Sequence, residues 1–171
     1  ALLVTVNPTD FPYEGVLGGM KWQREIEKKA YCVSGSYRAP AQLVGDFLAG
    51  KASVGPGAVA PTYRPGVTWC DLHSVLPQRI TDNLKKGILD LDKRMKGFAD
   101  TDAVLTGPET RSSSPVRFLR DDFYECSMNG DPLGGTYPCG EGAGYAGGIV
   151  SAGVDGIRVA EAILTDEHAG A

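Results

Sequence analysis

A glycine-rich segment near the end of the sequence has the composition of a backbone that comes close to a ligand. Five glycines fall within the nine residues 140–148. Because glycine has no Cβ and tolerates positive φ, the N–H groups of such a loop can press against an anion. A helix predicted from about residue 147 to residue 164 would add roughly half a positive charge at its N-terminus. We therefore expect the loop to bind a phosphate or an anionic heterocycle, and its candidate cofactor-binding residues are Gly140, Glu141, Gly142, Ala143, Gly144, Tyr145, Ala146, Gly147, Gly148 and Ile149.

The segment Gly142–Gly147 is a literal GxGxxG, the phosphate-binding pattern of dinucleotide-binding βαβ units. Such a unit also needs a second strand with an acidic residue about 20 residues further on. Asp166 and Glu167 lie at about that distance, but the sequence ends at Ala171 and leaves no room for a second strand. We therefore expect a loop that leads into a helix N-terminus, not a complete βαβ unit. A tight turn with a purely structural role is the alternative.

A second polar cluster lies on a turn between two predicted strands. An arginine beside three hydroxyl groups is rich in hydrogen-bond donors and suits the phosphate or carboxylate of a substrate. The alternative is a hairpin turn whose arginine forms a surface ion pair, for example with Glu109. The candidate substrate-binding residues are Arg111, Ser112, Ser113 and Ser114.

Length and charge narrow the class of protein. The sequence has 171 residues and a net charge of −4, and it has no basic run of the kind that binds nucleic acid. No apolar run approaches the roughly 20 residues that span a bilayer, so we expect no membrane segment. No signal peptide is recognisable, and we therefore expect a cytoplasmic protein.

The cysteines and histidines predict neither a metal site nor a catalytic group. The four cysteines are spread widely and form no CxxC pair, which argues against zinc and in favour of reduced thiols. The two histidines, His73 and His168, lie far apart in the sequence, so no nucleophilic set with a cysteine can be assembled. We assign no catalytic residues.

Hydrophobic periodicity predicts an α+β fold with a small mixed sheet and several helices. The predicted helices cover residues 20–33, 41–48, 80–95 and 147–164, and a capping box from Thr68 to Asp71 marks the start of another. The predicted strands cover residues 2–6, 103–106, 115–119 and 136–138. The last of these strands would complete a strand–glycine loop–helix at the end of the chain.

The glycine loop belongs to a longer run, Tyr137-Pro138-Cys139-Gly140-Glu141-Gly142-Ala143-Gly144-Tyr145-Ala146-Gly147-Gly148-Ile149, which is followed by Asp155-Gly156. This run resembles the C-terminal flavin-contacting motif of a family of uncharacterised FAD-dependent dehydrogenases, which are related to flavoproteins with two dinucleotide-binding domains. The upstream segments that resemble the same family are Tyr37-Arg38-Ala39-Pro40-Ala41-Gln42, Gly45-Asp46-Phe47-Leu48, Lys96-Gly97-Phe98 and Thr106-Gly107-Pro108-Glu109-Thr110-Arg111-Ser112-Ser113-Ser114-Pro115-Val116-Arg117. The resemblance covers nearly the whole chain.

This resemblance implies FAD as the cofactor of the intact protein, a small-molecule substrate, and NAD(P)H as a candidate electron donor. Residues 1–134 would form a substrate or cap domain, and residues 135–171 would supply the last strand and helix of the FAD-binding domain. Family members begin with an ADP-binding βαβ unit that this chain lacks. We therefore expect a fragment of an oxidoreductase that is inactive alone and whose exposed apolar surface allows a homodimer.

The resemblance also implies roles for individual residues. The N–H groups around Gly147, Gly148 and Ile149 would face the N1/O2 edge of the flavin, and Glu141 would lie near its ribityl or pyrophosphate portion. Tyr145 would pack either at the flavin edge or in the core. Two other classes stay open from the sequence: a self-standing module that binds a nucleotide or a phosphorylated metabolite, and a protein-interaction domain.

Overall fold

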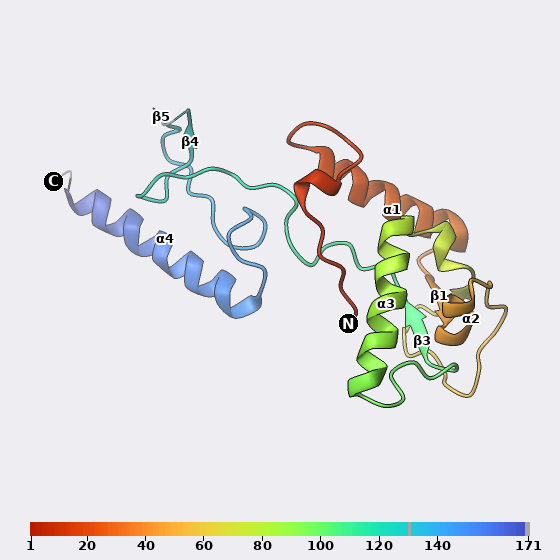
Figure 1. Cartoon of the computed structure of the whole chain (residues 1–171). Coiled ribbons are helices and arrows are strands. Elements are labelled where there is room, and N and C mark those ends of the chain that lie inside the picture. Colours follow the sequence, from red (N-terminus) through yellow and green to blue (C-terminus); the bar gives the residue numbers. More distant parts are fainter. Residues whose placement is uncertain (130, 170–171) are drawn as a thin grey trace. The chain divides into compact units, whose positions relative to one another are not determined.

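The computed structural model of the chain describes residues 1–129 and 131–169. Within these residues lie four α-helices and a mixed three-stranded sheet, which confirms the predicted α+β fold (Figure 1). The chain divides into two compact units. The first unit comprises Ala1–Asp10 and Trp22–Thr110, and the second comprises Phe11–Lys21 and Arg111–Ala171. The predicted assignment of residues 1–134 to a cap domain and of residues 135–171 to a cofactor domain concerns function and stays a prediction.

The sheet of the first unit is built around β1 (Ala39–Leu43), which pairs on both edges. It runs parallel to β2 (Val67–Trp69) and antiparallel to β3 (Val104–Thr106). The helix predicted for residues 41–48 is therefore wrong in its first part, since α2 begins only at Val44 and ends at Ala49. Pairing on two edges outweighs the local helix signal, because a central strand gains hydrogen bonds on both sides.

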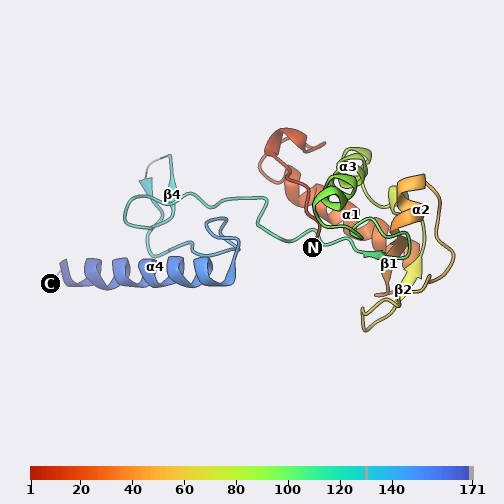
Figure 2. The ribbon, with the colours of Figure 1, turned by 60° about the horizontal axis from the view of Figure 1, so that its bottom comes forward.

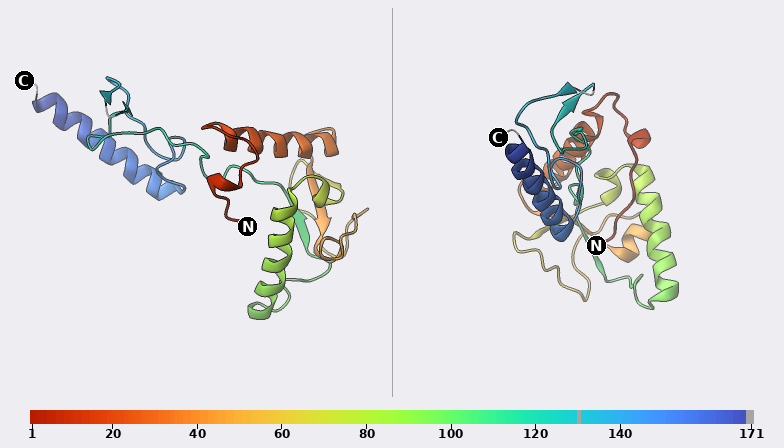
Figure 3. Two further views of the ribbon diagram at one scale, coloured as in Figure 1. Left: turned by 45° about the horizontal axis from the view of Figure 1, so that its top comes forward. Right: turned by 90° about the vertical axis from the view of Figure 1, so that its left-hand side faces the viewer.

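The core of the first unit gathers around the buried residues Val44, Phe47, Leu72 and Ile88. Ile88 belongs to α3 (Gln78–Arg94), which confirms the helix predicted for residues 80–95. The helix begins directly after Pro77, which has no N–H group to donate within a helix. It lies alongside β3, whose Leu105 packs against the same core (Figures 1 and 3).

Two predicted features of the first unit take another form. The capping signal at Thr68–Asp71 does not open a long helix, because Thr68 lies in β2. Asp71 does act as a cap: its side chain accepts a hydrogen bond from the His73 N–H at 3.0 Å, at the start of the short 3₁₀-helix η2 (Leu72–Ser74). Residues 2–6 form no strand, although Leu2 packs against the core.

Three further helices occur among the described residues. The 3₁₀-helix η1 covers Pro8–Asp10. Helix α1 (Gly18–Ser34) confirms the helix predicted for residues 20–33, and Gly35 follows it with a φ of 63°. Helix α4 (Ile149–Ala169) confirms the predicted terminal helix, although it starts later and continues further than expected (Figure 2).

The second unit differs from prediction before the glycine loop. Residues 115–119 and residues 136–138 form no strand, so the predicted strand–loop–helix lacks its strand. A small antiparallel pair lies instead further upstream, where β4 (Ser127–Met128) pairs with β5 (Asp131–Pro132). Thr136 holds the adjacent segment in place, since its carbonyl accepts a hydrogen bond from the Cys126 N–H at 2.6 Å.

None of the helices in the described part of the chain combines the length and apolarity that a membrane crossing requires. Asp166 and Glu167, the acidic residues weighed for a βαβ unit, lie in α4, and their side chains fall outside the described part.

Candidate functional site

Two glycines of the loop are required by its own backbone. Gly140 has a φ of 69° and Gly144 a φ of 84°, a region that favours glycine. A Cβ at Gly144 would also lie only 2.5 Å from the Val116 carbonyl oxygen. The Gly144 N–H donates to the Glu141 carbonyl at 2.9 Å, and the Tyr145 N–H donates to the Gly140 carbonyl at 3.1 Å. These bonds close the loop into a tight turn, which confirms a structural role for part of the glycine pattern.

Three other glycines are not required by the fold of this chain. Gly142, Gly147 and Gly148 do not have the positive φ of the left-handed region. A Cβ at Gly142 would meet no atom within 4 Å, and one at Gly147 or Gly148 would make only ordinary contacts, at 3.7 and 3.4 Å respectively. Glycine costs conformational entropy, and neither the backbone conformation nor the packing of this chain requires it at these three positions.

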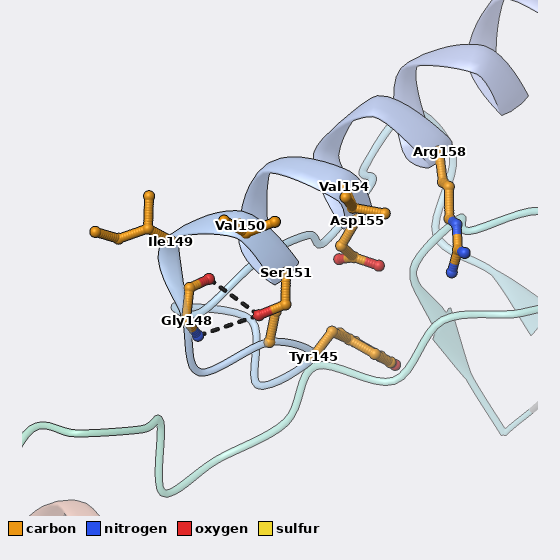
Figure 4. A pocket seen from close by; sticks show the side chains of 9 residues that line it. Tyr145, Gly148, Ile149, Val150, Ser151, Val154, Asp155 and Arg158 are labelled. Atoms are coloured by element: carbon orange, nitrogen blue, oxygen red, sulfur yellow. Dashed lines mark hydrogen bonds between the residues drawn. The ribbon is translucent and has the colours of Figure 1, made fainter.

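The N-terminus of α4 stands directly after these glycines. The Ser151 hydroxyl accepts from the Gly148 N–H at 3.2 Å and donates to the Gly148 carbonyl at 3.0 Å (Figure 4). Of the three N–H groups predicted to face a ligand, that of Gly148 is therefore already engaged. The N–H groups of the first helical turn have no acceptor within the helix, and they carry the positive end of its dipole. Ile149 and Val150 leave this turn open, since they are 95% and 78% exposed.

A hollow of about 780 Å³ lies beside the same turn. Figure 4 shows the residues that line it, with Asp155 and Tyr145 on the side of α4 toward the loop and Ile149 pointing away. Arg158 adds a cationic group to its wall. The hollow is open to solvent and is not an enclosed cavity, so it offers a surface against which part of a larger ligand can lie. The lining residues all fall between positions 145 and 158, so the hollow belongs to one unit.

A nearly buried ion pair joins the segment before the loop to the helix after it. Arg120 donates to Asp155 through both terminal nitrogens, at 2.6 and 3.0 Å, and the two side chains are only 10% and 13% exposed. Asp155 therefore faces the protein rather than solvent. The hydrogen bond from Arg120, helped by a second one from the Gly140 N–H at 2.8 Å, holds the pKa of the Asp155 carboxyl below its ordinary value.

Tyr145 is packed by arginine side chains. The Arg120 guanidinium lies 3.6 Å from the centre of the Tyr145 ring, and that of Arg117 lies 4.9 Å away. Arg117 also donates to the Gly144 carbonyl at 2.9 Å. Tyr145 is thus half-buried beneath cationic groups, and its alternative role at a flavin edge stays a prediction. Sequence reasoning missed Arg117 and Arg120, because neither lies near the loop in the sequence and nothing in their spacing connects them with it.

The serine-rich turn is brought close to the glycine loop. The backbone carbonyl of Ser112 and the Cβ of Ser113 lie 3.7 and 3.9 Å from the position of a Cβ on Gly147. Ser114 is used locally, since its hydroxyl donates to the Val116 carbonyl at 2.8 Å. Arg111 is exposed. The two predicted clusters therefore meet within the second unit.

Glu141 and Cys139 are both exposed in the structure. A contact of Glu141 with a cofactor stays a prediction. Among the residues that the structure describes, no group of three or more histidine, cysteine or carboxylate side chains is placed to hold a metal ion.

The geometry defines a class of site: a glycine loop and an open helix N-terminus on an α+β scaffold, suited to an anionic ligand. Residues 1–112 match the family described as FAD-dependent protein, C-terminal domain-like. The chain belongs to this family. The matched region ends close to the boundary of the first unit at Thr110, so the glycine loop lies beyond it.

An uncharacterised protein of Clostridium beijerinckii is similar to nearly the whole chain. The two sequences are 49% identical over 165 residues, which is 96% of this chain. A match of that extent includes the glycine loop. The chain spans about 30% of the length of this relative, so the relative carries a large further part.

Proposed function

We propose that this chain supplies the substrate domain and the flavin-facing loop of an FAD-dependent oxidoreductase. The observation that carries the proposal is the trio Gly142, Gly147 and Gly148, which the fold of the chain leaves unconstrained beside an open helix N-terminus. Membership of a family described as FAD-dependent supports the same cofactor. The open hollow beside the loop offers a surface for part of a larger cofactor.

The residues present fit one end of FAD. Gly147 and Gly148 allow close approach of the backbone, and the N–H groups of Ile149 and Val150 point the positive end of α4 at an anionic edge. Glu141 is exposed in the same loop, and its carboxylate can accept a hydrogen bond from a ribityl hydroxyl. FAD, when bound, supplies the ring that accepts and passes on a hydride. Preorganised N–H donors at the anionic edge favour the reduced form of such a ring.

The substrate domain is the second part of this proposal. Part of the turn lies close to Gly147, through the Ser112 carbonyl and the Ser113 Cβ, and the turn carries the exposed side chains of Arg111, Ser112 and Ser113. They suit a phosphate or carboxylate of a small-molecule substrate, with NAD(P)H as a candidate donor of electrons. The catalytic residues are not assigned.

The proposal also requires a partner, the remaining part of a longer polypeptide that holds the ADP half of FAD. Helix α4 supports this, because Ile149, Val150 and Ile157 are exposed apolar side chains. A Cβ at Gly153 or Gly156 would meet no atom within 4 Å. Small residues beside apolar ones allow close packing, and this face has room for a sheet or helix of the remaining part.

Flavin binding tests the proposal. The longer C. beijerinckii relative should purify with bound flavin, or take it up from added FAD, with its characteristic visible absorbance. The 171-residue chain should retain little flavin after gel filtration. Stoichiometric, tight binding of FAD by the chain alone would show that no further part is needed. A relative that takes up no flavin, while inorganic pyrophosphate stabilises this chain against heat, would favour a phosphate-binding module instead.

A matched pair of variants locates the site in a protein in which this chain replaces the corresponding segment of the relative. Gly147→Val places a branched side chain where the backbone is proposed to meet the flavin, and we expect it to lower FAD affinity by at least about tenfold, the effect of a steric misfit. The control must replace a glycine that lacks a positive φ, which excludes Gly97 with its φ of 93°. Gly87→Val is suitable, since Gly87 lies in α3 and a Cβ there meets no atom within 4 Å.

A further inference from the structure

Arg120 is the common partner of four separate points around the glycine loop. Its terminal nitrogen Nη1 donates to the Pro138 carbonyl at 2.8 Å, before the loop, and both terminal nitrogens bind Asp155 in α4, after it. Its guanidinium lies over the ring of Tyr145, inside the loop, and over that of Tyr124 at 4.6 Å. Through the Asp155 carboxylate it is also linked to the Gly140 N–H.

We propose that Arg120 is a positioning residue, which fixes the shape of residues 138–148 for the flavin through its bonds to Pro138, Asp155 and Tyr145. The inference rests on the proposed function for the identity of the ligand. Arg120 does not contact that ligand itself, because its side chain is only 10% exposed and its terminal nitrogens are engaged with the protein.

The loop needs such a residue because of its composition. A segment with five glycines in nine residues has many accessible backbone conformations, and ordering it costs more entropy than ordering other residues. The internal bonds of the loop join only neighbours, from Gly140 to Tyr145 and from Glu141 to Gly144. A planar guanidinium with several donors in a fixed fork can hold a carbonyl, a carboxylate and an aromatic face at once, which a lysine ammonium does less well.

The first test measures hydrogen–deuterium exchange in the full 171-residue chain. Arg120→Leu should raise the exchange rate of residues 138–148 by about tenfold, in line with the loss of a charge-assisted hydrogen-bond pair. Exchange in α3 should not change, which shows that the first unit keeps its fold. Arg120→Lys keeps a cation near Asp155 and should give an intermediate rate.

The matched control removes another arginine–aspartate pair. Arg79 binds Asp10 at 3.0 Å in the first unit, and Arg79→Leu should leave the exchange of residues 138–148 unchanged. Equal exchange of the loop in the parent chain and in both Arg120 variants would overturn the proposal. If Arg120→Leu speeds exchange throughout the second unit, the milder Arg120→Lys decides the question. Under the proposal, Arg120→Lys raises the exchange rate of residues 138–148 and leaves that of the last turns of α4 unchanged.

The second test measures FAD affinity in the protein in which this chain replaces the corresponding segment of the C. beijerinckii relative. We expect Arg120→Leu to weaken FAD binding by about tenfold and Arg79→Leu to leave it unchanged. If the parent protein binds FAD and Arg120→Leu binds it equally well, the positioning role is wrong while the proposed function stands. If the parent protein binds no FAD, the proposed function fails, and the flavin role of Arg120 fails with it, whatever the exchange rates show.

Discussion

At the scale of single residues, the loop contains two kinds of glycine. Gly140 and Gly144 satisfy a backbone requirement, because both have positive φ. Gly142, Gly147 and Gly148 satisfy none within this chain. A plain structural turn explains the first kind only. The second kind gives the loop its proposed function, since a side chain at these positions would occupy space that the protein itself leaves open.

The structural glycines can be tested by a pair of alanine variants. Gly144→Ala should destabilise the second unit by about 2 kcal/mol or more, because it combines a strained φ with a contact to the Val116 carbonyl. Gly142→Ala should change stability by about 0.5 kcal/mol or less. Urea unfolding monitored by circular dichroism gives both values. Similar losses in the two variants would mean that the distinction between the glycines does not hold.

Asp155 predicts how the second unit responds to acid. Its pKa is lowered in the folded chain, from an ordinary value of 3.8, chiefly by the hydrogen bond from Arg120. The ionised carboxylate therefore stabilises the folded state above pH 3.8, and this contribution is lost as the pH falls through the folded pKa. NMR titration of the Asp155 carboxyl carbon should give a midpoint below 3.8 in the parent chain and a higher one in Arg120→Leu. An unchanged midpoint in that variant would assign the shift to another group.

The sequence predicted the glycine loop correctly as a feature but not the residues that hold it. Glycine density is a local pattern, so it can be recognised without the fold. The contact between Arg120 and Asp155 joins residues 35 positions apart, and only folding of the second unit brings them together.

At the scale of elements, α4 has a composition that its surroundings in this chain do not explain. Gly153 and Gly156 lie inside the helix, where glycine costs about 0.5–1 kcal/mol relative to alanine. Neither has a neighbouring atom within 4 Å of the position of a Cβ. Val159 is buried, whereas Val150 and Ile157 are exposed. The helix therefore has one face that packs within the chain and another that is apolar and uncovered.

Replacing either of these two glycines with alanine should have opposite effects on stability in the 171-residue chain and in the longer protein. In the 171-residue chain, Gly153→Ala and Gly156→Ala should each stabilise α4 by about 0.5–1 kcal/mol, since alanine is the better helix former and meets no obstacle. In a protein that also contains the remaining part of the relative, the same changes should lower stability and flavin content, because the helix would pack closely there. Thermal unfolding of both proteins checks the signs. Stabilisation in both would exclude close packing on this face.

Prediction of elements succeeded where the signal was long, whereas of the short predicted strands only that at residues 103–106 is confirmed, as β3. Helices α1 and α3 each extend over several turns with apolar residues on one side, so their periodicity is unambiguous. The strand predicted for residues 2–6 has a suitable composition but no neighbouring strand in the structure. Residues 39–43 have a helix signal at Pro40, yet they become the central strand because two partners are available.

At the scale of the whole molecule, the two compact units differ in how far the similarity to known proteins covers them. The family match covers residues 1–112, which include the whole first unit and Phe11–Lys21 of the second, whereas the loop and α4 lie beyond the match. The C. beijerinckii relative is similar across both, and it is more than three times as long as the matched region. The proposed function therefore concerns a larger protein, in which we propose that the second unit contacts the cofactor and that the remaining part covers α4.

The uncovered face of α4 predicts the behaviour of the 171-residue chain in solution. Ile149, Val150 and Ile157 expose apolar surface that, in the absence of the remaining part, is buried most readily against a second copy. Sedimentation velocity should show association that increases with concentration. Ile157→Glu should weaken it by about tenfold or more, since a charge in an apolar interface is costly to bury.

A control variant in the first unit distinguishes association through α4 from nonspecific hydrophobic association. Leu89 lies in α3 and is 52% exposed, close to the 60% of Ile157, so Leu89→Glu removes a similar exposed apolar side chain. Association should persist in Leu89→Glu and be lost in Ile157→Glu. If both variants associate as the parent chain does, or if the parent chain is monomeric at every concentration, α4 does not form the self-association surface. In the longer protein the same Ile157→Glu change should disturb packing of α4 on the remaining part, so flavin content should fall there while Leu89→Glu retains it.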